Sequence, residues 1–255
     1  MASNPVPQLL ERLGVPRSGV LFVHSAFRDL GREGLTPEGV IESLAAHAKG
    51  GTLLLPTMSW RYVKPDKPEF SELETPSNVG VLTEVFRTKY ASARSLHPTH
   101  SVAGLGADAA AMLGEHHLDD TPCAARSPFG KLVPADAWIL MLGIGFDCCT
   151  LIHHGEEVVA PDIYLRPRAQ AETYACKDRH GKVHTVRLRR HFLLPRDYWQ
   201  FQDLLERDRK IRIAWLGNAA CRAFRARDLH ERVIATLKAR PDAILARPGQ
   251  RYRMM

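Results

Sequence analysis

The sequence predicts an α/β fold: a central mixed sheet covered by helices on both faces, with an added β-hairpin region. Three short segments, residues 20–24 (VLFVH), 52–56 (TLLLP) and 138–142 (WILML), are apolar at nearly every position and predict strands. Successive side chains of a strand point to opposite faces, so these strands are expected to be buried on both faces. Helical patterns alternate with them along the chain, and we expect residues 1–255 to form a single domain.

Local signals set the other elements of the first half. Residues 5–14 form a short amphipathic pattern, and Thr36 followed by Pro37 starts a helix that Gly50-Gly51 ends. Residues 60–76 are polar and rich in proline and are expected to be a loop over one sheet edge. Residues 79–90 place apolar side chains on one side of a third helix.

The second half begins with a long segment, residues 92–134, in which only an alanine-rich helix near 107–113 is expected. Long ordered loops in compact domains are usually functional. Residues 150–159 predict a helix, and residues 174–188 alternate around Arg179-His180-Gly181-Lys182 as a β-hairpin does. A strand at 211–215 and a closing helix at 229–240 complete the expected elements.

One segment accounts for the formal net charge of +7. Its basic residues are Arg166, Arg168, Lys177, Arg179, Lys182, Arg187, Arg189, Arg190 and Arg196, against the acidic Glu172 and Asp178. Nucleic-acid binding, a groove for phosphates of a small molecule, and a solvated strand face all explain such a segment. No helix-turn-helix, zinc-finger or RNA-binding motif accompanies it, and we expect no nucleic-acid partner.

Cysteine usage and hydropathy indicate a cytoplasmic protein. The five cysteines are odd in number and have no repeating spacing, which argues against a disulfide framework. The N-terminal residues have no basic flank followed by an apolar core, as a signal peptide would. No apolar run approaches the roughly 18–20 residues of a membrane span, so no membrane partner is expected.

Segments that follow the apolar strands are the first candidates for a site. They are residues 24–27, 56–60 and 143–157, with 97–101 as a plausible fourth wall. Ligands of α/β sheets collect at the carboxyl ends of the strands, so these segments are expected to surround one crevice.

The densest group of reactive side chains lies at residues 150–157. On a helix His153 shares a face with Glu156 and Glu157, and a neighbouring carboxylate fixes the tautomer of an imidazole and favours its protonated state. This pattern predicts a general base, and a surface helix end with mixed charges is the plain alternative. A zinc site using His97, His100, His153, His154 and Glu156 is a second functional interpretation. A nucleophilic Cys148 or Cys149 is a third.

Several motifs resemble, in order along nearly the whole chain, those of the aminoglycoside 3-N-acetyltransferase family. They include residues 94–101 (RSLHPTHS), 127–132 (SPFGKL), 142–147 (LGIGFD), 216–224 (LGNAACRAF) and Thr150-x-x-His153-x-x-Glu156. The resemblance implies an α/β fold distinct from the Gcn5-related acetyltransferases, acetyl-CoA as the donor and no metal. It also implies direct acetyl transfer to an amine in a ternary complex.

The resemblance also implies roles for individual residues. His153 matches the family's base, and Glu156 the carboxylate of the same motif. The coenzyme-binding residues it implies are His24, Ser25, Ala26, Phe27, Arg94, Ser95, His97, Pro98, Thr99, His100 and Ser101. For the acceptor we expect Trp60, Asp147, Glu157 and Asp162.

Two features depart from the family pattern. Where members commonly show Asp-x-Asn-Thr, this chain has Asp147-Cys148-Cys149-Thr150, so the role of the asparagine is missing or moved. The basic segment is the second departure, because a polycationic aminoglycoside binds unfavourably beside uncompensated cations. If residues 165–200 border the acceptor, an amino sugar carrying phosphate or a nucleotide is the better acceptor.

The function expected from the sequence is therefore acetyl transfer from acetyl-CoA to an amino sugar or aminoglycoside-like amine. A metal-dependent hydrolase using His97, His100, His153 and Glu156, and a basic nucleic-acid-binding protein, are the alternatives. The oligomeric state is left open, with a homodimer as one option.

Overall fold

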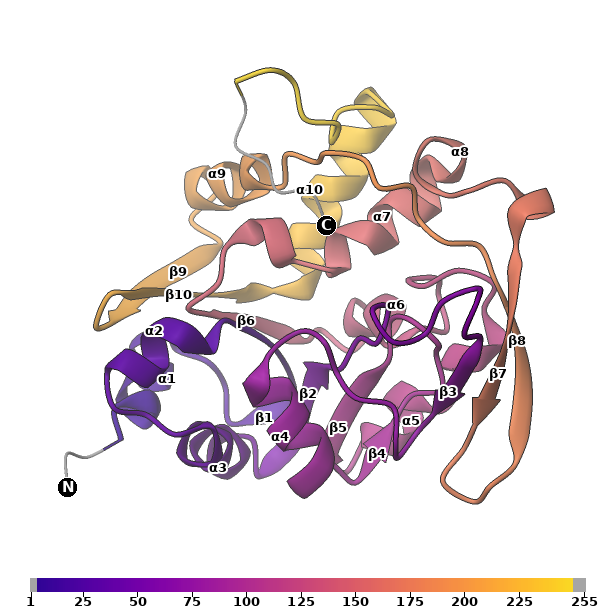
Figure 1. Ribbon diagram of the computed structural model, residues 1–255. Coiled ribbons are helices and arrows are strands. Elements are labelled where there is room, and N and C mark those ends of the chain that lie inside the picture. Colours follow the sequence, from indigo (N-terminus) through magenta and orange to yellow (C-terminus); the bar gives the residue numbers. More distant parts are fainter. Residues whose placement is uncertain (1–3, 250–255) are drawn as a thin grey trace.

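A seven-stranded mixed sheet forms the centre of the computed structural model, which describes residues 4–249 (Figure 1). The strand order is β4–β5–β2–β1–β6–β10–β9, in which β1 is parallel to β2 and β6 and the other neighbours are antiparallel. The strands are β1 Ser18–Ser25, β2 Gly50–Pro56, β4 Ala93–Arg94, β5 Val102–Gly106, β6 Trp138–Leu142, β9 Ile211–Leu216 and β10 Ala219–Arg225. The predicted central mixed sheet is confirmed.

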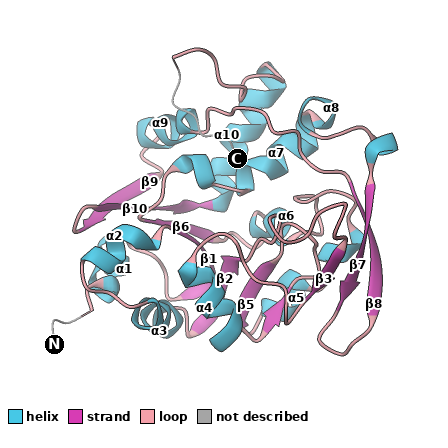
Figure 2. Cartoon of the chain, viewed as in Figure 1, coloured by secondary structure: helices cyan, strands magenta, loops and turns pink. Residues whose placement is uncertain are grey.

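The two faces of this sheet are buried in two separate hydrophobic cores. Phe22 of β1 belongs to one core and its neighbour Val23 to the other, as the alternation of a strand requires. The first core contains side chains of α5 Ala109–Leu113, α6 Pro128–Leu132, α7 Leu151–Val159, α9 Trp199–Arg207 and α10 Ala226–Ala239. The second contains those of α1 Val6–Arg12, α2 Phe27–Arg32, α3 Pro37–His47 and α4 Val81–Lys89. Helices therefore cover both faces, as predicted (Figure 2).

A second, three-stranded sheet stands beside the first and contains the predicted hairpin. Its strands are β3 Glu69–Ser71, β7 Glu172–Lys177 and β8 Val183–Leu188, in that order, with β3 parallel to β7. The expectation that residues 60–76 are only a loop is wrong for β3. No local signal marks this strand, because its only strand partner lies about a hundred residues later in the chain.

Other elements are not predicted by the sequence. In residues 92–134 the structure has β4, β5, α6 and a 3₁₀ turn at His116–Leu118, and α2, α9 and β10 are likewise unpredicted. Short helical segments at Phe146–Cys148, Pro161–Tyr164 (α8) and Arg168–Gln170 complete the description. β5 gives no clear strand signal because Gly104 and Gly106 interrupt its apolar pattern. At Gly104 a Cβ atom would crowd Leu54 and Leu113.

Helix α7 carries the predicted base and packs closely on α10. Gly155 lies in the middle of α7, and a Cβ atom there would overlap Cγ1 of Val233 in α10. The missing side chain lets the two helices approach and fixes the height of α7 above the sheet. Within residues 4–249, no helix is both long and apolar enough to cross a membrane.

Candidate active site

The carboxyl ends of β1 and β6 lie side by side. Ser25 pairs with Leu142, and the N–H of Ala26 donates to the carbonyl of Leu142 at 3.0 Å. Gly143 follows with φ of 66°, where a Cβ atom would lie 3.1 Å from the carbonyl oxygen of Ala26. The close approach requires glycine, and the predicted proximity of these two segments is confirmed.

The segment predicted as a fourth wall lies against the end of β2. The N–H of Thr57 donates to the carbonyl of Ser101 at 2.8 Å, and the N–H of Ser59 to that of Thr99 at 3.0 Å. The hydroxyl of Ser59 donates to the carbonyl of Pro98 at 2.8 Å. Residues 97–101 are therefore held beside the carboxyl end of the strand, where ligands of such sheets bind.

His153 and Glu156 form a buried pair on α7. Nδ1 of His153 lies 2.8 Å from Oε2 of Glu156, and the two side chains are 2% and 0% exposed. The hydroxyl of Tyr198 donates to Oε1 of Glu156 at 2.9 Å and lies 3.0 Å from Nδ1 of His153. Nε of Arg196 donates to Oε1 of Glu156 at 2.8 Å. An ionised Glu156 fixes the proton of His153 on Nδ1, which leaves the lone pair of Nε2 free to accept a proton.

Burial dominates the protonation of this pair. It lowers the pKa of His153 to about 4, in spite of Glu156, which raises it, and His191 and Arg196 add to the lowering. The expected effect of the carboxylate is present, but burial outweighs it. Burial alone would raise the pKa of Glu156, yet the fields of His153 and Arg196 lower it to about 2. At neutral pH the pair is an unprotonated imidazole beside an ionised carboxylate.

Three residues around the pair are missed by sequence reasoning. Arg196, Tyr198 and His191 belong to residues 189–198, hereafter the strap, which returns from the hairpin past α7. The ring of His191 stacks on that of His153 with centroids 4.2 Å apart and an interplanar angle of 24°. In the sequence this segment is only a run of charge, because contacts with residues some forty positions earlier leave no local pattern.

Several predicted coenzyme-binding residues at or beside the carboxyl ends of the strands have buried polar atoms. Nε2 of His24, Oγ of Ser25 and Nε2 of His97 have no hydrogen-bond partner among the described residues. Burial lowers the pKa of His24 to about 3, so its ring is neutral. Buried polar atoms are nearly always hydrogen-bonded in folded proteins, so unpaired ones at the ends of strands are suited to a polar ligand.

Arg94, also predicted to bind the coenzyme, directs its guanidinium at the protein itself. Nε donates to the hydroxyls of Thr57 and Ser101 at 3.2 and 3.1 Å, and Nη2 to the carbonyl of Thr57 at 2.8 Å. Nη1 donates to the carbonyls of Glu72 and Thr75 at 3.2 and 2.5 Å. These bonds tie β4 to the segment that follows β3.

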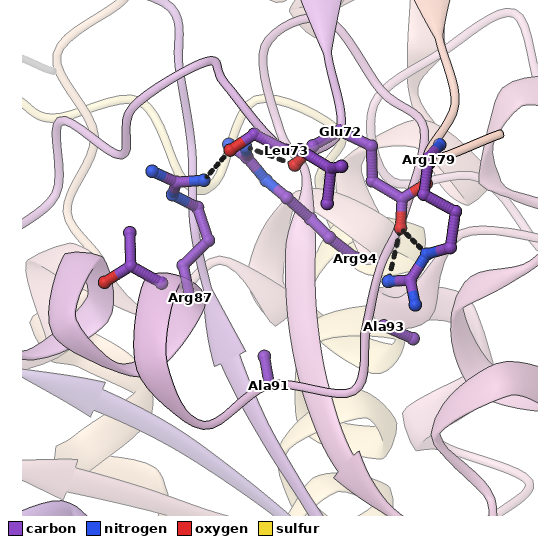
Figure 3. A pocket seen from close by; sticks show the side chains of 8 residues that line it. Glu72, Leu73, Arg87, Ala91, Ala93, Arg94 and Arg179 are labelled. Carbon is purple, nitrogen blue, oxygen red and sulfur yellow. Dashed lines mark hydrogen bonds and ion pairs between the residues drawn. The ribbon is translucent and has the colours of Figure 1, made fainter. Parts of the chain in front are cut away.

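A small cavity of about 160 Å³ lies beside Arg94 and is also lined by Arg87, Arg179 and Glu72 (Figure 3). Arg179, in the turn of the hairpin, donates from Nε to Glu72 at 2.7 Å and from Nη1 to the carbonyl of Ser92 at 2.6 Å, and the second bond joins the small sheet to the edge of the large one at β4. A larger cavity of about 670 Å³ lies over β3, β7 and residues 62–67. His153 lines neither cavity.

The four predicted acceptor residues lie on different segments. Trp60 is 37% exposed and the guanidinium of Arg61 lies 5.5 Å from its ring centroid, while Asp162 is exposed on α8. Asp147 is half-buried in the 3₁₀ turn between β6 and α7. Glu157 is engaged within the protein.

Both carboxylate oxygens of Glu157 accept hydrogen bonds. Oε2 accepts from the hydroxyl of Thr121 at 2.6 Å and Oε1 from the N–H of Cys123 at 2.9 Å. Nε2 of His191 lies 2.8 Å from Oε1. Glu157 therefore joins α7, the loop at 121–123 and the strap.

The structure does not assemble the metal cluster considered as an alternative. Within residues 4–249, the one group of three side chains that could surround an ion is His153, Glu156 and His191. His97 and His100 lie outside this group, and Nδ1 of His97 accepts from the N–H groups of Thr99 and His100. The three donors already contact protein groups, and Arg196 places a cation on Glu156, which opposes a second one.

The two candidate nucleophiles differ in burial: Cys149 is a core residue, whereas Cys148 is half-buried with its Sγ 3.9 Å from Oδ2 of Asp147. Cys149 is fully buried in the hydrophobic core that also contains side chains of α7, and burial raises the pKa of its thiol. Cys123 is likewise buried, with its pKa raised well above the ordinary value. A thiol is nucleophilic as the thiolate, so neither Cys149 nor Cys123 has the environment of a nucleophile. Cys149, in place of the family's usual asparagine, contributes apolar packing.

Most of the basic segment is neutralised by carboxylates. Six of its nine cations form ion pairs: Arg166 and Arg190 with Glu172, Arg168 with Asp120, Lys177 with Glu74, Arg179 with Glu72, and Arg196 with Glu156. Four of these five carboxylates come from outside the segment. In the folded protein, carboxylates from other parts of the chain therefore offset most of the positive charge of this segment. This weakens the argument that the acceptor is an anionic amine.

Known proteins are similar to this chain in sequence and in fold. Residues 22–238 match the family described as aminoglycoside 3-N-acetyltransferase. The aminoglycoside N(3)-acetyltransferase IV of Salmonella sp is 36% identical over 152 residues, covering 59% of this chain and 56% of that protein, little more than half its length. A mutant of aminoglycoside acetyltransferase AAC(3)-IVa in complex with a gentamicin has a TM-score of 0.78 and 26% identity, over 95% of this chain and 90% of that one.

The fold likeness extends to AAC-IIIb, whose binary complex with CoASH has a TM-score of 0.78 at 23% identity, over 92% of this chain and 95% of that one. The predicted α/β fold is thus confirmed by solved structures over nearly the whole chain. With the family match over residues 22–238, the chain belongs to the aminoglycoside 3-N-acetyltransferase family.

Proposed function

We propose that this protein transfers the acetyl group of acetyl-CoA to an amine of an aminoglycoside or related amino sugar, with His153 as the general base. The observation that carries the proposal is the buried pair of His153 and Glu156, whose nitrogen and oxygen lie 2.8 Å apart. Family membership supports the reaction class, and the local geometry supports the assignment of the base.

The proposed chemistry requires an unprotonated base and an oriented ring. Acetyl-CoA supplies a thioester carbonyl; the acceptor nitrogen bonds to its carbon, the carbon–sulfur bond breaks, and the proton that this nitrogen loses on forming the amide passes to the sulfur, so that the coenzyme leaves as the thiol. An ammonium must first lose a proton, and Nε2 of His153 accepts it while Glu156 holds Nδ1. Glu156 then faces the imidazolium that forms and stabilises its charge.

The residues present fit acetyl-CoA as the donor. His24, Ser25 and His97 each have an unpaired polar atom near the carboxyl ends of the strands. We assign them to the coenzyme together with Ala26, Phe27, Ser95, Pro98, Thr99, His100 and Ser101. Arg94 contributes by holding Thr57 and Ser101 in place.

An aminoglycoside is the acceptor class that we favour. The related AAC(3)-IVa binds a gentamicin, and the ion pairs of the basic segment remove most of the repulsion expected for a polycation. Asp147, at the start of the α7 region, is our assignment for an acceptor carboxylate, with Trp60 and Asp162 as outlying contacts. Glu157 contributes indirectly, by its contacts with His191 and with the loop at residues 121–123.

The proposal extends to the organisation of the protein. We take the chain as one acetyltransferase domain, since Arg94 and Arg179 join the small sheet to the large one. The five cysteines form no disulfide within residues 4–249, which supports a cytoplasmic location.

Thiol release from acetyl-CoA with gentamicin, apramycin and a nucleotide-linked amino sugar as acceptors tests the function. We expect the two aminoglycosides to be acetylated, and a clear preference for the nucleotide-linked sugar would contradict the acceptor assignment. Mass spectrometry of the protein incubated with acetyl-CoA alone is expected to show no acetylated enzyme. A stable acetyl-enzyme would contradict direct transfer.

A further inference from the structure

The ring of His191 covers one face of the base. Its centroid lies 4.2 Å from that of His153 with the rings 24° from parallel, and its side chain is 9% exposed. Behind it the ring of His100 meets His191 edge-on, with centroids 6.1 Å apart at 90°. The base therefore has an imidazole on one face and, through Nδ1, a carboxylate in its ring plane.

Glu157 anchors His191 to the helix that carries the base. Nε2 of His191 lies 2.8 Å from Oε1 of Glu157, within ion-pair distance but without hydrogen-bond geometry, and the other contacts of Glu157 are to Thr121 and Cys123. His153 and Glu157 lie four residues apart on α7, so one helix presents both the ring that is covered and the anchor of the ring that covers it.

We propose that His191 is a positioning residue of the site: stacked on His153 and anchored by Glu157, it holds the base in place and opposes its protonation. This inference rests on the proposed function, since it assigns His191 a task in the same reaction. The face of a ring forms no hydrogen bond to another ring's nitrogen, so His191 acts through packing and charge and takes no proton from His153.

The charged and titratable groups around His153 decide whether replacing His191 raises or lowers the pKa of His153. Glu156 faces His153 from its own helix, Arg196, Tyr198 and His191 face it from the strap, and His100 lies behind His191. Glu157, His100 and His153 face His191. The rings of His191 and His153 are in direct contact, so positive charge on one opposes positive charge on the other.

Replacing His191 by phenylalanine keeps a ring for stacking but removes that repulsion and leaves Glu157 without this partner. The freed carboxylate favours a proton on His153, so both changes raise the pKa of the base. His191→Gln removes the ring but keeps a polar group that reaches Glu157, so its effect on the pKa is expected to be smaller. Changing Glu157 to glutamine in the His191→Phe background removes the freed charge and should reverse part of the rise.

The chain offers a matched control one residue away. His154 is also buried on α7 and stacks on His230, with centroids 5.1 Å apart and rings 23° from parallel. His230→Phe alters an imidazole stack on the same helix without touching the His153 group. It is expected to leave the pH profile of transfer unchanged.

The experiment measures the pH dependence of kcat/KM for the full chain and titrates His153 by NMR with ¹⁵N-labelled histidine. For His191→Phe we expect the acid limb and the NMR pKa of His153 to move to higher pH by about 0.5–1 unit. We also expect kcat at pH 8 to fall about threefold to tenfold in His191→Gln, which removes the stacked ring, and to fall less in His191→Phe, which keeps one. His191→Gln should also move the acid limb and the NMR pKa of His153 to higher pH, but by a smaller amount.

A pH profile and an NMR pKa that match the wild type in both His191 variants, with only a lower melting temperature, would overturn the proposal. The proposal would also be overturned if His230→Phe moved the pH profile and the NMR pKa of His153 as far as His191→Phe does. Absence of acetyl transfer by the wild type would instead contradict the proposed function, while the NMR titration still decides whether His191 acts on His153.

Discussion

His153 and His154 are neighbours on α7, both are buried, and each stacks on a second imidazole, yet different groups hold them. Nδ1 of His153 faces the carboxylate of Glu156 at 2.8 Å, whereas Nδ1 of His154 lies 2.6 Å from the carbonyl oxygen of Cys123. Burial and stacking are common to both, so they do not make a base. What distinguishes His153 is an ionised partner, Glu156, and its contacts with Tyr198 and His191 of the strap.

The sharpest contrast between the two histidines is expected in activity. His153→Ala should lower kcat by about 10²- to 10⁴-fold, the usual contribution of a general base, and should leave acetyl-CoA binding intact. His154→Ala should keep most of the activity and lower the free energy of unfolding by about 1–3 kcal/mol, because it leaves the buried carbonyl of Cys123 unpaired. Steady-state kinetics, calorimetric titration with acetyl-CoA and urea unfolding measure these effects.

A result in which His154→Ala loses as much activity as His153→Ala, at equal stability, would remove the distinction. Loss of acetyl-CoA binding in His153→Ala would place that residue in the coenzyme site instead of the acceptor chemistry.

Acid should destabilise the protein through imidazoles that are buried as neutral groups. Burial lowers the pKa of each of these below the ordinary value of about 6.5: His24, His97, His100, His116 and His153. The unfolded chain then binds more protons than the folded one, so stability is complete above the unfolded pKa and falls as the pH drops through it.

At pH 5 each such ring is expected to cost up to about 2 kcal/mol relative to pH 8. Glu156, with a lowered pKa, adds a loss of the same sign below about pH 4.5. Urea unfolding at pH 8, 6 and 5 measures the slope, and a stability that is flat over this range would show that the rings are solvated or protonated in the folded state.

A smaller effect is expected from Gly155, which lies just after the two histidines. Gly155→Ala should lower the free energy of unfolding by about 1–3 kcal/mol, because its Cβ atom overlaps Val233 of α10. Changing Val233 to alanine as well should recover part of that loss. Thermal unfolding of the single and double variants measures this recovery. If the losses in free energy of unfolding are additive, the two residues do not contact.

The same helix shows how far the sequence predicts the site. His153 and Glu156 lie three residues apart on one helix, so their pairing follows from local geometry and is predicted. Arg196, Tyr198 and His191 come from the strap, and only the folded chain brings them to α7. Glu157 lies on the same helix one residue further, whereas its actual partners come from elsewhere in the chain.

The fold follows a similar division. β1, β2 and β6 are predicted because burial on both faces makes them apolar along their length. β3 is missed because it depends on a distant partner, and β10 because it alternates small residues with arginines such as Arg222 and Arg225. Sequence patterns record burial and local spacing, and they carry little information about pairing across a hundred residues.

The buried pair of Glu156 and Arg196 restricts the substitutions that these two positions can accept. The side chain of Arg196 is 4% exposed and that of Glu156 is 0% exposed, so water cannot replace either partner. Losing one partner of such a pair leaves the other charge buried and costs about 3–5 kcal/mol, whereas replacing both with apolar residues can cost little stability. Descendants that abandon the chemistry are therefore expected to lose the two charges together, and those that keep it to retain both.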